Sequence, residues 1–160
     1  MKKVFSVILV LLLAGCGLKK ANIVPVTKGI AFDCNVTYYN EVYECKGNTD
    51  ATGNMVIEFL SPTDIKGLRF AFKEGSVTSS FKDTEYKAQK IVFENSVASF
   101  VYDVLANVNA EVVKQGDLFY SEGVTDNFEY KLHLGGTGLP IKITTRPDAV
   151  TVVFKNVKIK

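Results

Sequence analysis

The clearest structural pattern in the chain is a pair of segments, Phe32-Asp33-Cys34-Asn35-Val36-Thr37-Tyr38 and Tyr43-Glu44-Cys45-Lys46. In both segments apolar and polar residues alternate, which is typical of a β-strand with one buried face. Two such strands that turn around Tyr39-Asn40 predict an antiparallel hairpin. The register of this hairpin places Cys34 opposite Cys45 on the apolar face.

The same two-residue period recurs along most of the remaining chain, with turn residues between the repeats. Ser61-Pro62, Lys82-Asp83 and the Gly135-Gly136-Thr137-Gly138 loop are examples of these turns. Successive hairpins predict an antiparallel sheet, in which we expect about ten strands. The further strand segments are residues 54–60, 67–73, 77–81, 86–93, 118–120, 128–134, 141–143, 150–154 and 157–159.

One segment departs from this period and predicts a helix over residues 97–108. Its apolar residues fall at positions i, i+3, i+4, i+7, i+8 and i+11, which is one face of an amphipathic helix. Ser96, or Asn95 just before it, has a side chain suited to an N-cap. The apolar stripe predicts that this helix covers one face of the sheet. The stripe consists of Val97, Phe100, Val101, Val104, Leu105 and Val108.

The N-terminus has the pattern of a secretory signal that ends in a lipidation site. Lys2 and Lys3 precede an apolar run over residues 4–13. The last residue of this run begins the motif Leu13-Ala14-Gly15-Cys16. The run is shorter than the roughly 20 residues that a membrane-spanning helix needs. Small residues at its end are typical of a cleavage site. The segment resembles the lipobox of bacterial lipoprotein precursors.

This resemblance implies cleavage after Gly15 and diacylation of the Cys16 thiol by fatty acyl chains such as palmitate. The mature protein would then be extracytoplasmic and held on the cell membrane by its N-terminal lipid. Gly17 after the anchor, rather than Asp, would permit sorting to an outer membrane if the host has one. We therefore expect a signal peptide over residues 1–15, a lipidated tether over 16–29 and a single β-domain over 30–160.

Composition restricts the functional classes that this domain can belong to. Removal of residues 1–15 takes two lysines away, so the 19 Lys and Arg residues fall to 17 and equal the 17 Asp and Glu residues. A nucleic-acid partner is not expected, because no cluster of basic residues remains. The chain has 11 Phe and 7 Tyr but no Trp. Abundant aromatic and β-branched residues favour strands.

Two cysteines, Cys34 and Cys45, remain once Cys16 is acylated. An extracytoplasmic compartment and the expected register predict a disulfide between them. Such a bond closes a loop of about 12 residues and contributes roughly 3 kcal/mol. Two buried free thiols, packed as small apolar groups, are the alternative. Redox chemistry is disfavoured because the spacing is not Cys-x-x-Cys.

Residues for catalysis or metal binding are sparse. The single histidine, His133, alternates with Glu129 and Lys131 and is expected on the solvent face of a strand. A catalytic histidine needs a nucleophile and an orienting acid, and a zinc site needs several His or Cys ligands. The chain has no Gly-x-Ser-x-Gly motif, and its glycine-rich loop joins two expected strands. We expect no enzymatic activity, cofactor or metal.

Several short motifs resemble the LolA-like superfamily of lipoprotein carriers and lipid-binding lipoproteins, most closely its small clostridial members. They are the segment over residues 53–62, Asp64-Ile65-Lys66-Gly67-Leu68-Arg69-Phe70, and Gly138-Leu139-Pro140-Ile141-Lys142-Ile143. The resemblance implies an unclosed antiparallel β-barrel, or strongly curved sheet, with a helix over its apolar concave face. In this family that face binds acyl chains.

We therefore expect a non-enzymatic binding protein that holds an acyl or lipid ligand between the sheet and the helix. A closed core without a ligand is the competing interpretation of the same apolar residues. In that case the domain would act as an envelope protein partner, for example as a regulator of a cell-wall hydrolase, as the similar spore-germination lipoproteins do. The expected ligand-binding residues are Phe59, Leu68, Phe70, Phe72, Phe100, Val104, Leu132 and Leu134.

Overall fold

The computed structural model describes residues 19–93 and 95–160. The expected signal peptide and lipidated Cys16 lie outside the described residues. The strands are β1 (Lys19–Lys20), β2 (Ile30–Tyr38), β3 (Glu41–Thr49), β4 (Met55–Ser61), β5 (Arg69–Lys73), β6 (Ser76–Phe81), β7 (Thr84–Gln89), β8 (Val113–Gln115), β9 (Leu118–Val124), β10 (Glu129–Leu134), β11 (Pro140–Arg146) and β12 (Val150–Ile159). A 3-10 helix, η1 (Lys90–Phe93), precedes the α-helix α2 (Val97–Ala106).

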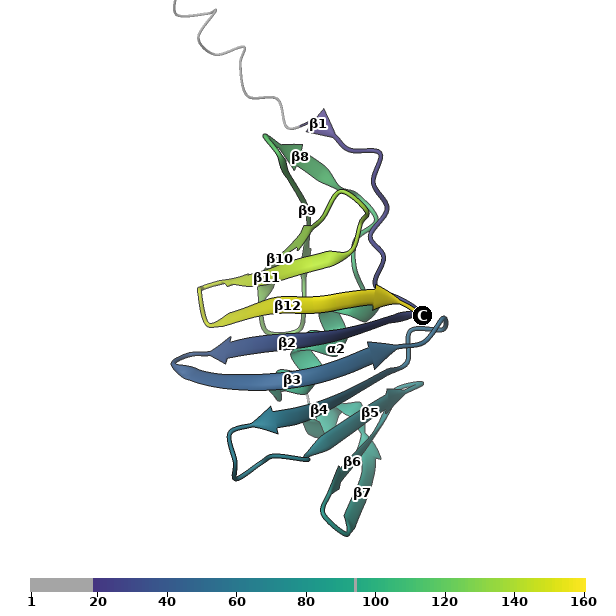
Figure 1. The fold of residues 1–160 in the computed structure, drawn as a ribbon, viewed down its shortest axis with the longest axis vertical. Coiled ribbons are helices and arrows are strands. Elements are labelled where there is room, and N and C mark those ends of the chain that lie inside the picture. Colours follow the sequence, from purple (N-terminus) through teal and green to yellow (C-terminus); the bar gives the residue numbers. More distant parts are fainter. Residues whose placement is uncertain (1–18, 94) are drawn as a thin grey trace, which may run out of the picture.

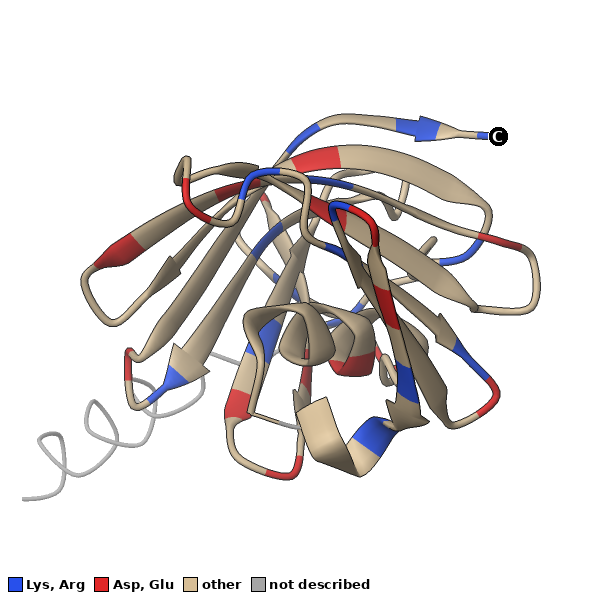
Figure 2. Cartoon of the chain, turned by 90° about the horizontal axis from the view of Figure 1, so that it is seen from below, with Lys and Arg blue, Asp and Glu red and all other residues tan. Residues whose placement is uncertain are grey.

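All strands belong to one antiparallel sheet, whose order is β1-β8-β9-β10-β11-β12-β2-β3-β4-β5-β6-β7. The sheet curves around α2, which lies on its concave side (Figures 1 and 2). It does not close into a barrel, because β1 and β7 remain at opposite edges. The predicted fold class is thereby confirmed. The sheet has twelve strands rather than about ten.

The central strands follow the two-residue period of the sequence. In β2, buried residues alternate with half-buried ones, and Ile30, Phe32, Cys34 and Val36 point into the core. β2 pairs with β3 on one side and with β12 on the other, so the two ends of the domain meet at the centre of the sheet. Burial of one face sets this register, since a shift by one residue would expose every apolar side chain.

Two aromatic side chains fold over glycines on the neighbouring strand. Phe32 pairs with Gly47, and Tyr130 pairs with Gly123. A Cβ atom at position 47 would lie 2.6 Å from the Phe32 ring, and one at position 123 would lie 2.5 Å from the Tyr130 oxygen. Glycine is therefore required at both positions, because any larger residue would displace the ring that fills the core.

α2 begins as the sequence predicts and ends slightly earlier. Ser96 is its N-cap, and the Ser96 hydroxyl accepts a hydrogen bond of 3.1 Å from the Ser99 N–H. The helix ends at Ala106, so Val108 lies beyond it but still packs on the core. Within the described residues, no helix is long and apolar enough to cross a membrane.

The strand predicted over residues 86–93 is partly wrong. β7 ends at Gln89, and the next four residues form η1. Gln89 pairs with Ser76, the first residue of β6, and the Lys90 N–H still donates to the Gly75 oxygen at 3.0 Å. Beyond this point β6 offers β7 no further partner, so the chain leaves the sheet and leads into α2.

Candidate functional site

The expected site is the space between α2 and the concave face of the sheet. Seven of the eight expected lining residues are buried, and the eighth, Leu68, is partly buried and packs against them. They belong to one continuous apolar core together with residues of β2, β11 and β12. The structure thus brings all eight residues together in this core.

Aromatic rings fill much of this space. Phe72 of β5 stacks on Tyr102 of α2, with ring centroids 4.5 Å apart and planes inclined by 8°. The rings of Phe93 in η1 and Phe70 in β5 meet edge to face, with centroids 5.4 Å apart. Such offset and edge contacts stabilise aromatic pairs beyond the area that they bury. The cover of the concave face, η1 and α2, is therefore packed directly onto the sheet.

A small cleft lies at the N-terminal half of α2. Phe100 and Asp103 border this cleft of about 40 Å³ together with Phe128, which directly precedes β10. The Asn127 amide donates to the Asn95 side-chain oxygen at 3.0 Å and joins the loop before β10 to the start of the helix. Ligand sites usually have several hundred Å³. In this conformation the cleft is too small for an acyl chain.

Of the larger cavities of the described chain, one of about 270 Å³ lies at the C-terminal end of α2, and two lie on polar strand faces. One of these two, of about 530 Å³, is bordered by residues of β9, β10 and β11, including Lys131 and His133. The other, of about 730 Å³, is bordered by residues of β2 to β5 and β12. Neither is lined by any of the eight expected ligand-binding residues. Their mixed charges do not suit an apolar ligand.

The cover carries a partly buried ion pair that the sequence analysis missed. The Lys90 ammonium of η1 pairs with the Asp103 carboxylate of α2, and Asp103 is only 8% exposed. Lys90 also lies over the Tyr102 ring, 5.7 Å from its centroid. Burial raises the pKa of Asp103, and the hydrogen bond and charge of Lys90 counteract this rise. In the sequence, such a pair is indicated by an acidic residue next to the apolar stripe of the helix, here Asp103 beside Val104.

Cys34 and Cys45 occupy the predicted register, opposite each other on the buried face of β2 and β3. The structure has both residues as free thiols, so the predicted disulfide is not present in it. The hydrogen bond between the two thiols, followed by burial, raises the pKa of Cys34 above its ordinary value. A thiol with a raised pKa is a poor nucleophile and a poor metal ligand.

His133 lies on the polar face of β10, as predicted, and is half-buried there. Burial lowers its pKa, as do the neighbouring charges of Lys131 and Lys142. Lys131 forms an ion pair of 3.0 Å with Glu122 and lies 4.0 Å from the centroid of the Tyr120 ring. Within the described residues, no group of three or more His, Cys, Asp or Glu side chains is placed to hold a metal.

Comparison with known proteins identifies similar folds. No family model and no curated protein sequence matches the chain. An uncharacterized conserved protein from Thermus thermophilus has a similar crystal structure, with a TM-score of 0.57, 10% identity, and coverage of 84% of this chain and 80% of that one. A LolA superfamily protein from Nitrosomonas europaea gives a TM-score of 0.47 and 8% identity, over 82% and 84% of the two chains. At 10% identity, the first similarity establishes the fold alone.

Proposed function

We propose that the chain is a non-enzymatic, lipid-anchored extracytoplasmic binding protein, whose ligand is an acyl chain or a lipid-bearing molecule. The ligand would lie between the concave face of the sheet and α2. The proposal is carried by one observation: the cover of this apolar face is small. It consists of η1 and a ten-residue helix, joined to each other by the Lys90–Asp103 ion pair.

A single, partly buried ion pair holds such a cover only weakly. Desolvation of both charges offsets most of their attraction, whereas apolar side chains at the same positions would often be more stable. Loss of the pair would free η1 from α2 and expose Phe70 and Phe72 beneath them. An acyl chain offers these rings the same kind of contact that Tyr102 and Phe93 now make.

Ligand uptake in this mechanism requires displacement of α2. The cleft beside Phe100 has a volume of about 40 Å³ and must widen to several hundred Å³. Such a site is a minor conformation that the ligand stabilises by binding to it preferentially. Lipidation at Cys16 would keep the domain at the membrane surface, where acyl ligands are present. Retention or transfer of a lipid at that surface fits an anchored protein better than a soluble shuttle does.

Acyl binding can be tested with the mature protein and a fluorescent fatty acid. Lys90→Met keeps an unbranched side chain of similar length in η1 but removes the ammonium group of the ion pair, so the cover should open more readily. We expect tighter apparent binding and faster association than in the parent protein. The matched control is Lys66→Met, which changes an exposed lysine outside the cover and should bind as the parent does. Native mass spectrometry should also detect a co-purified lipid.

The proposal fails if the parent protein and Lys90→Met both show no saturable binding of the fatty acid and carry no lipid. It also fails if Lys90→Met and Lys66→Met bind equally, because binding would then not involve the cover.

A second function, as a protein partner in the envelope, is favoured by exposed apolar residues near the cover. Tyr86 of β7 is 56% exposed, and Ile91 and Val92 of η1 are 66% and 59% exposed. Ile91 and Val92 are adjacent in η1, and neighbouring apolar side chains exposed together on a surface often mark a protein-binding site. A purified cell-wall amidase should then bind the parent protein and lose affinity for an Ile91→Ser/Val92→Ser variant. Unchanged binding of the amidase, or none, would exclude this surface.

A further inference from the structure

The sheet has one long open edge, at β7. Five of its six residues are exposed, and no strand of the described chain pairs with its outer side. The opposite edge strand, β1, has only two residues. Figure 1 shows β7 at the end of the sheet that is farthest from β1. A free edge presents unpaired N–H and C=O groups and can accept another strand.

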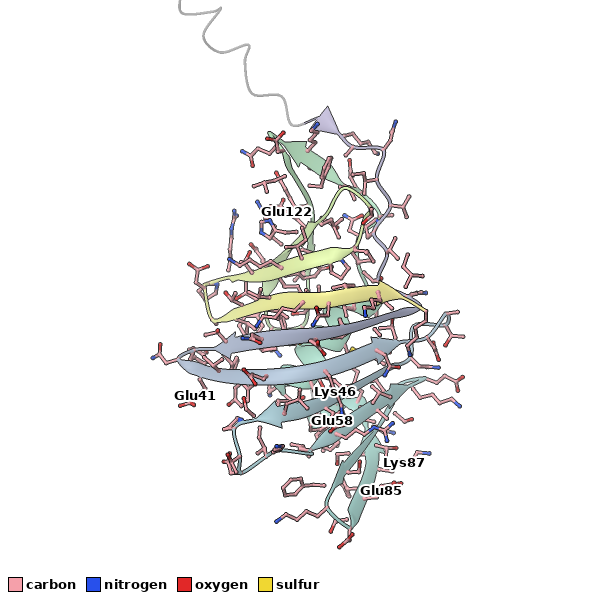
Figure 3. The ribbon with its side chains drawn as sticks, viewed as in Figure 1. Glu41, Lys46, Glu58, Glu85, Lys87 and Glu122 are labelled. Carbon is pink, nitrogen blue, oxygen red and sulfur yellow. The ribbon has the colours of Figure 1, made fainter. Side chains whose placement is uncertain are left out.

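Side chains of opposite charge lie side by side on this edge strand. Glu85 and Lys87 are both exposed and flank Tyr86 (Figure 3). They share one face of β7, because alternate residues of a strand point the same way. Tyr86 points to the other face, where its ring contacts Phe93 at 6.2 Å. None of the ion pairs between described residues involves Glu85 or Lys87.

The backbone groups of the same two residues face the open edge. The Ser79 hydroxyl donates to the Tyr86 carbonyl at 3.3 Å, and the Lys90 N–H donates to the Gly75 carbonyl at 3.0 Å. Positions 86 and 90 therefore direct their backbone groups toward β6. In an antiparallel pair this orientation alternates along the strand. The N–H and C=O groups of Glu85 and Lys87 consequently point away from β6.

We propose that β7 pairs with β7 of a second copy of this chain, antiparallel and about a two-fold axis at Tyr86. In this register Glu85 lies opposite Lys87 of the second copy, and Lys87 opposite its Glu85. Each of these two positions exchanges backbone hydrogen bonds across the axis, because their groups face the edge. The interface is isologous, since the same patch is used by both copies.

Charge selects this register over its neighbours. A pairing centred on Glu85 would place Glu85 opposite Glu85, and one centred on Lys87 would place Lys87 opposite Lys87. Like charges directly across a strand pair are destabilising, whereas opposite charges are stabilising. The edge is thus self-complementary in the register centred on Tyr86. Charged edge residues also serve to prevent strand pairing in many proteins, and the test distinguishes this role from dimerisation.

The expected dimer is weak in dilute solution. A single strand pair buries less than the roughly 1,200 Å² of a stable interface. Lipid anchors would confine both copies to one membrane surface, which raises their effective concentration. Dimerisation goes beyond the proposed lipid binding and does not depend on it, because β7 lies outside the apolar core.

Charge reversal provides the test, with the mature protein in detergent micelles and sedimentation velocity as the measurement. In the variant dimers, Glu85→Lys places a lysine opposite each Lys87, and Lys87→Glu places a glutamate opposite each Glu85. Each single variant should dimerise at least about tenfold more weakly than the parent. An equimolar mixture of the two variants should regain dimerisation, because each heterodimer contains two opposite-charge pairs. The double variant Glu85→Lys/Lys87→Glu should also dimerise as the parent does.

Glu41→Lys and Lys158→Glu are the matched controls, since both change exposed charges away from β7 and should not affect dimerisation. Circular dichroism should show equal folding of all variants, because the changed side chains are exposed. The proposal is overturned if the parent stays monomeric up to millimolar concentration. It is equally overturned if the single variants dimerise like the parent, or if their mixture does not recover.

Discussion

Cys34 of β2 lies directly opposite Cys45 of β3, and each side chain is 1% exposed. Their thiols are hydrogen-bonded to each other, which together with burial raises the pKa of Cys34. Cys34 therefore has little thiolate at neutral pH and is poorly suited to nucleophilic chemistry. The position of the pair at the centre of the sheet suits a structural role, either as packed thiols or as a cross-strand disulfide.

We predict that Cys34 and Cys45 form a disulfide in protein secreted to an oxidising compartment. A thiol reagent added in denaturant, without a reductant, should label neither residue. Reduction should lower the free energy of unfolding by about 3 kcal/mol, because the loop between the cysteines is released. The stability of a Cys34→Ser/Cys45→Ser variant should not respond to reductant. Labelling of both thiols in unreduced protein would contradict the prediction.

Lipidation at Cys16 is tested by Cys16→Ala. Alanine cannot accept an acyl chain, so the variant should persist as an uncleaved precursor or appear as a soluble protein without lipid. Membrane fractionation and intact mass measure the two outcomes. Cys45→Ala is the control, because it leaves the lipobox intact and should yield the lipidated mature mass. A Cys16→Ala protein that fractionates with membranes and has the mature mass would show that Cys16 is not the anchor.

The sequence predicts the long strands well because burial of one sheet face imposes their two-residue period. The hairpin register that places Cys34 opposite Cys45 follows from this period and is confirmed. The N-cap Ser96 is also a local feature, set by one side chain, and it is confirmed as well. β1 and β8 are too short to show any period. β8 forms a short hairpin with β9, and β1 pairs with β8 through contacts distant in sequence, Lys19 with Lys114 and Lys20 with Val113.

The state of the interior could not be predicted in the same way. The apolar residues of the expected site are identified by periodicity, but whether they enclose a cavity depends on how distant side chains fill the space. Tyr102 stacks on Phe72, and Asp103 forms an ion pair with Lys90 of η1. These contacts depend on the path of the chain between β7 and α2, where the sequence pattern instead predicts a longer strand.

His133 should make stability depend on pH between about 5 and 7. Burial and the charges of Lys131 and Lys142 lower its pKa in the folded protein below the ordinary value of 6.5. As the pH falls through this range, the unfolded chain binds the proton first, so the free energy of unfolding decreases. His133 is the only histidine of the chain. His133→Gln should therefore flatten this part of the profile in urea titrations, and an unchanged profile would contradict the assignment.

Val104 is fully buried in the C-terminal half of α2, and Val104→Asn tests whether the helix behaves as a separate cover. In the closed conformation the new amide has no room to reach water, and an unpaired buried polar group costs roughly 1–3 kcal/mol. If α2 can move away from the sheet, the amide is hydrated when it does so. The free-energy cost of burying the amide then favours local opening of the helix rather than unfolding of the whole domain.

We expect hydrogen exchange of the α2 amides to accelerate by about tenfold or more in Val104→Asn, while exchange in β2 and β3 changes little. The melting temperature should shift modestly, and affinity for the fluorescent fatty acid should decrease because the amide lies on the proposed acyl-binding face. Ala106→Asn, at the end of the helix, is the matched control and should leave exchange in α2 nearly unchanged. Equal acceleration in α2, β2 and β3 would show that helix and sheet unfold as one unit. In that case the interior is a permanent core, and function as a protein partner becomes the stronger proposal.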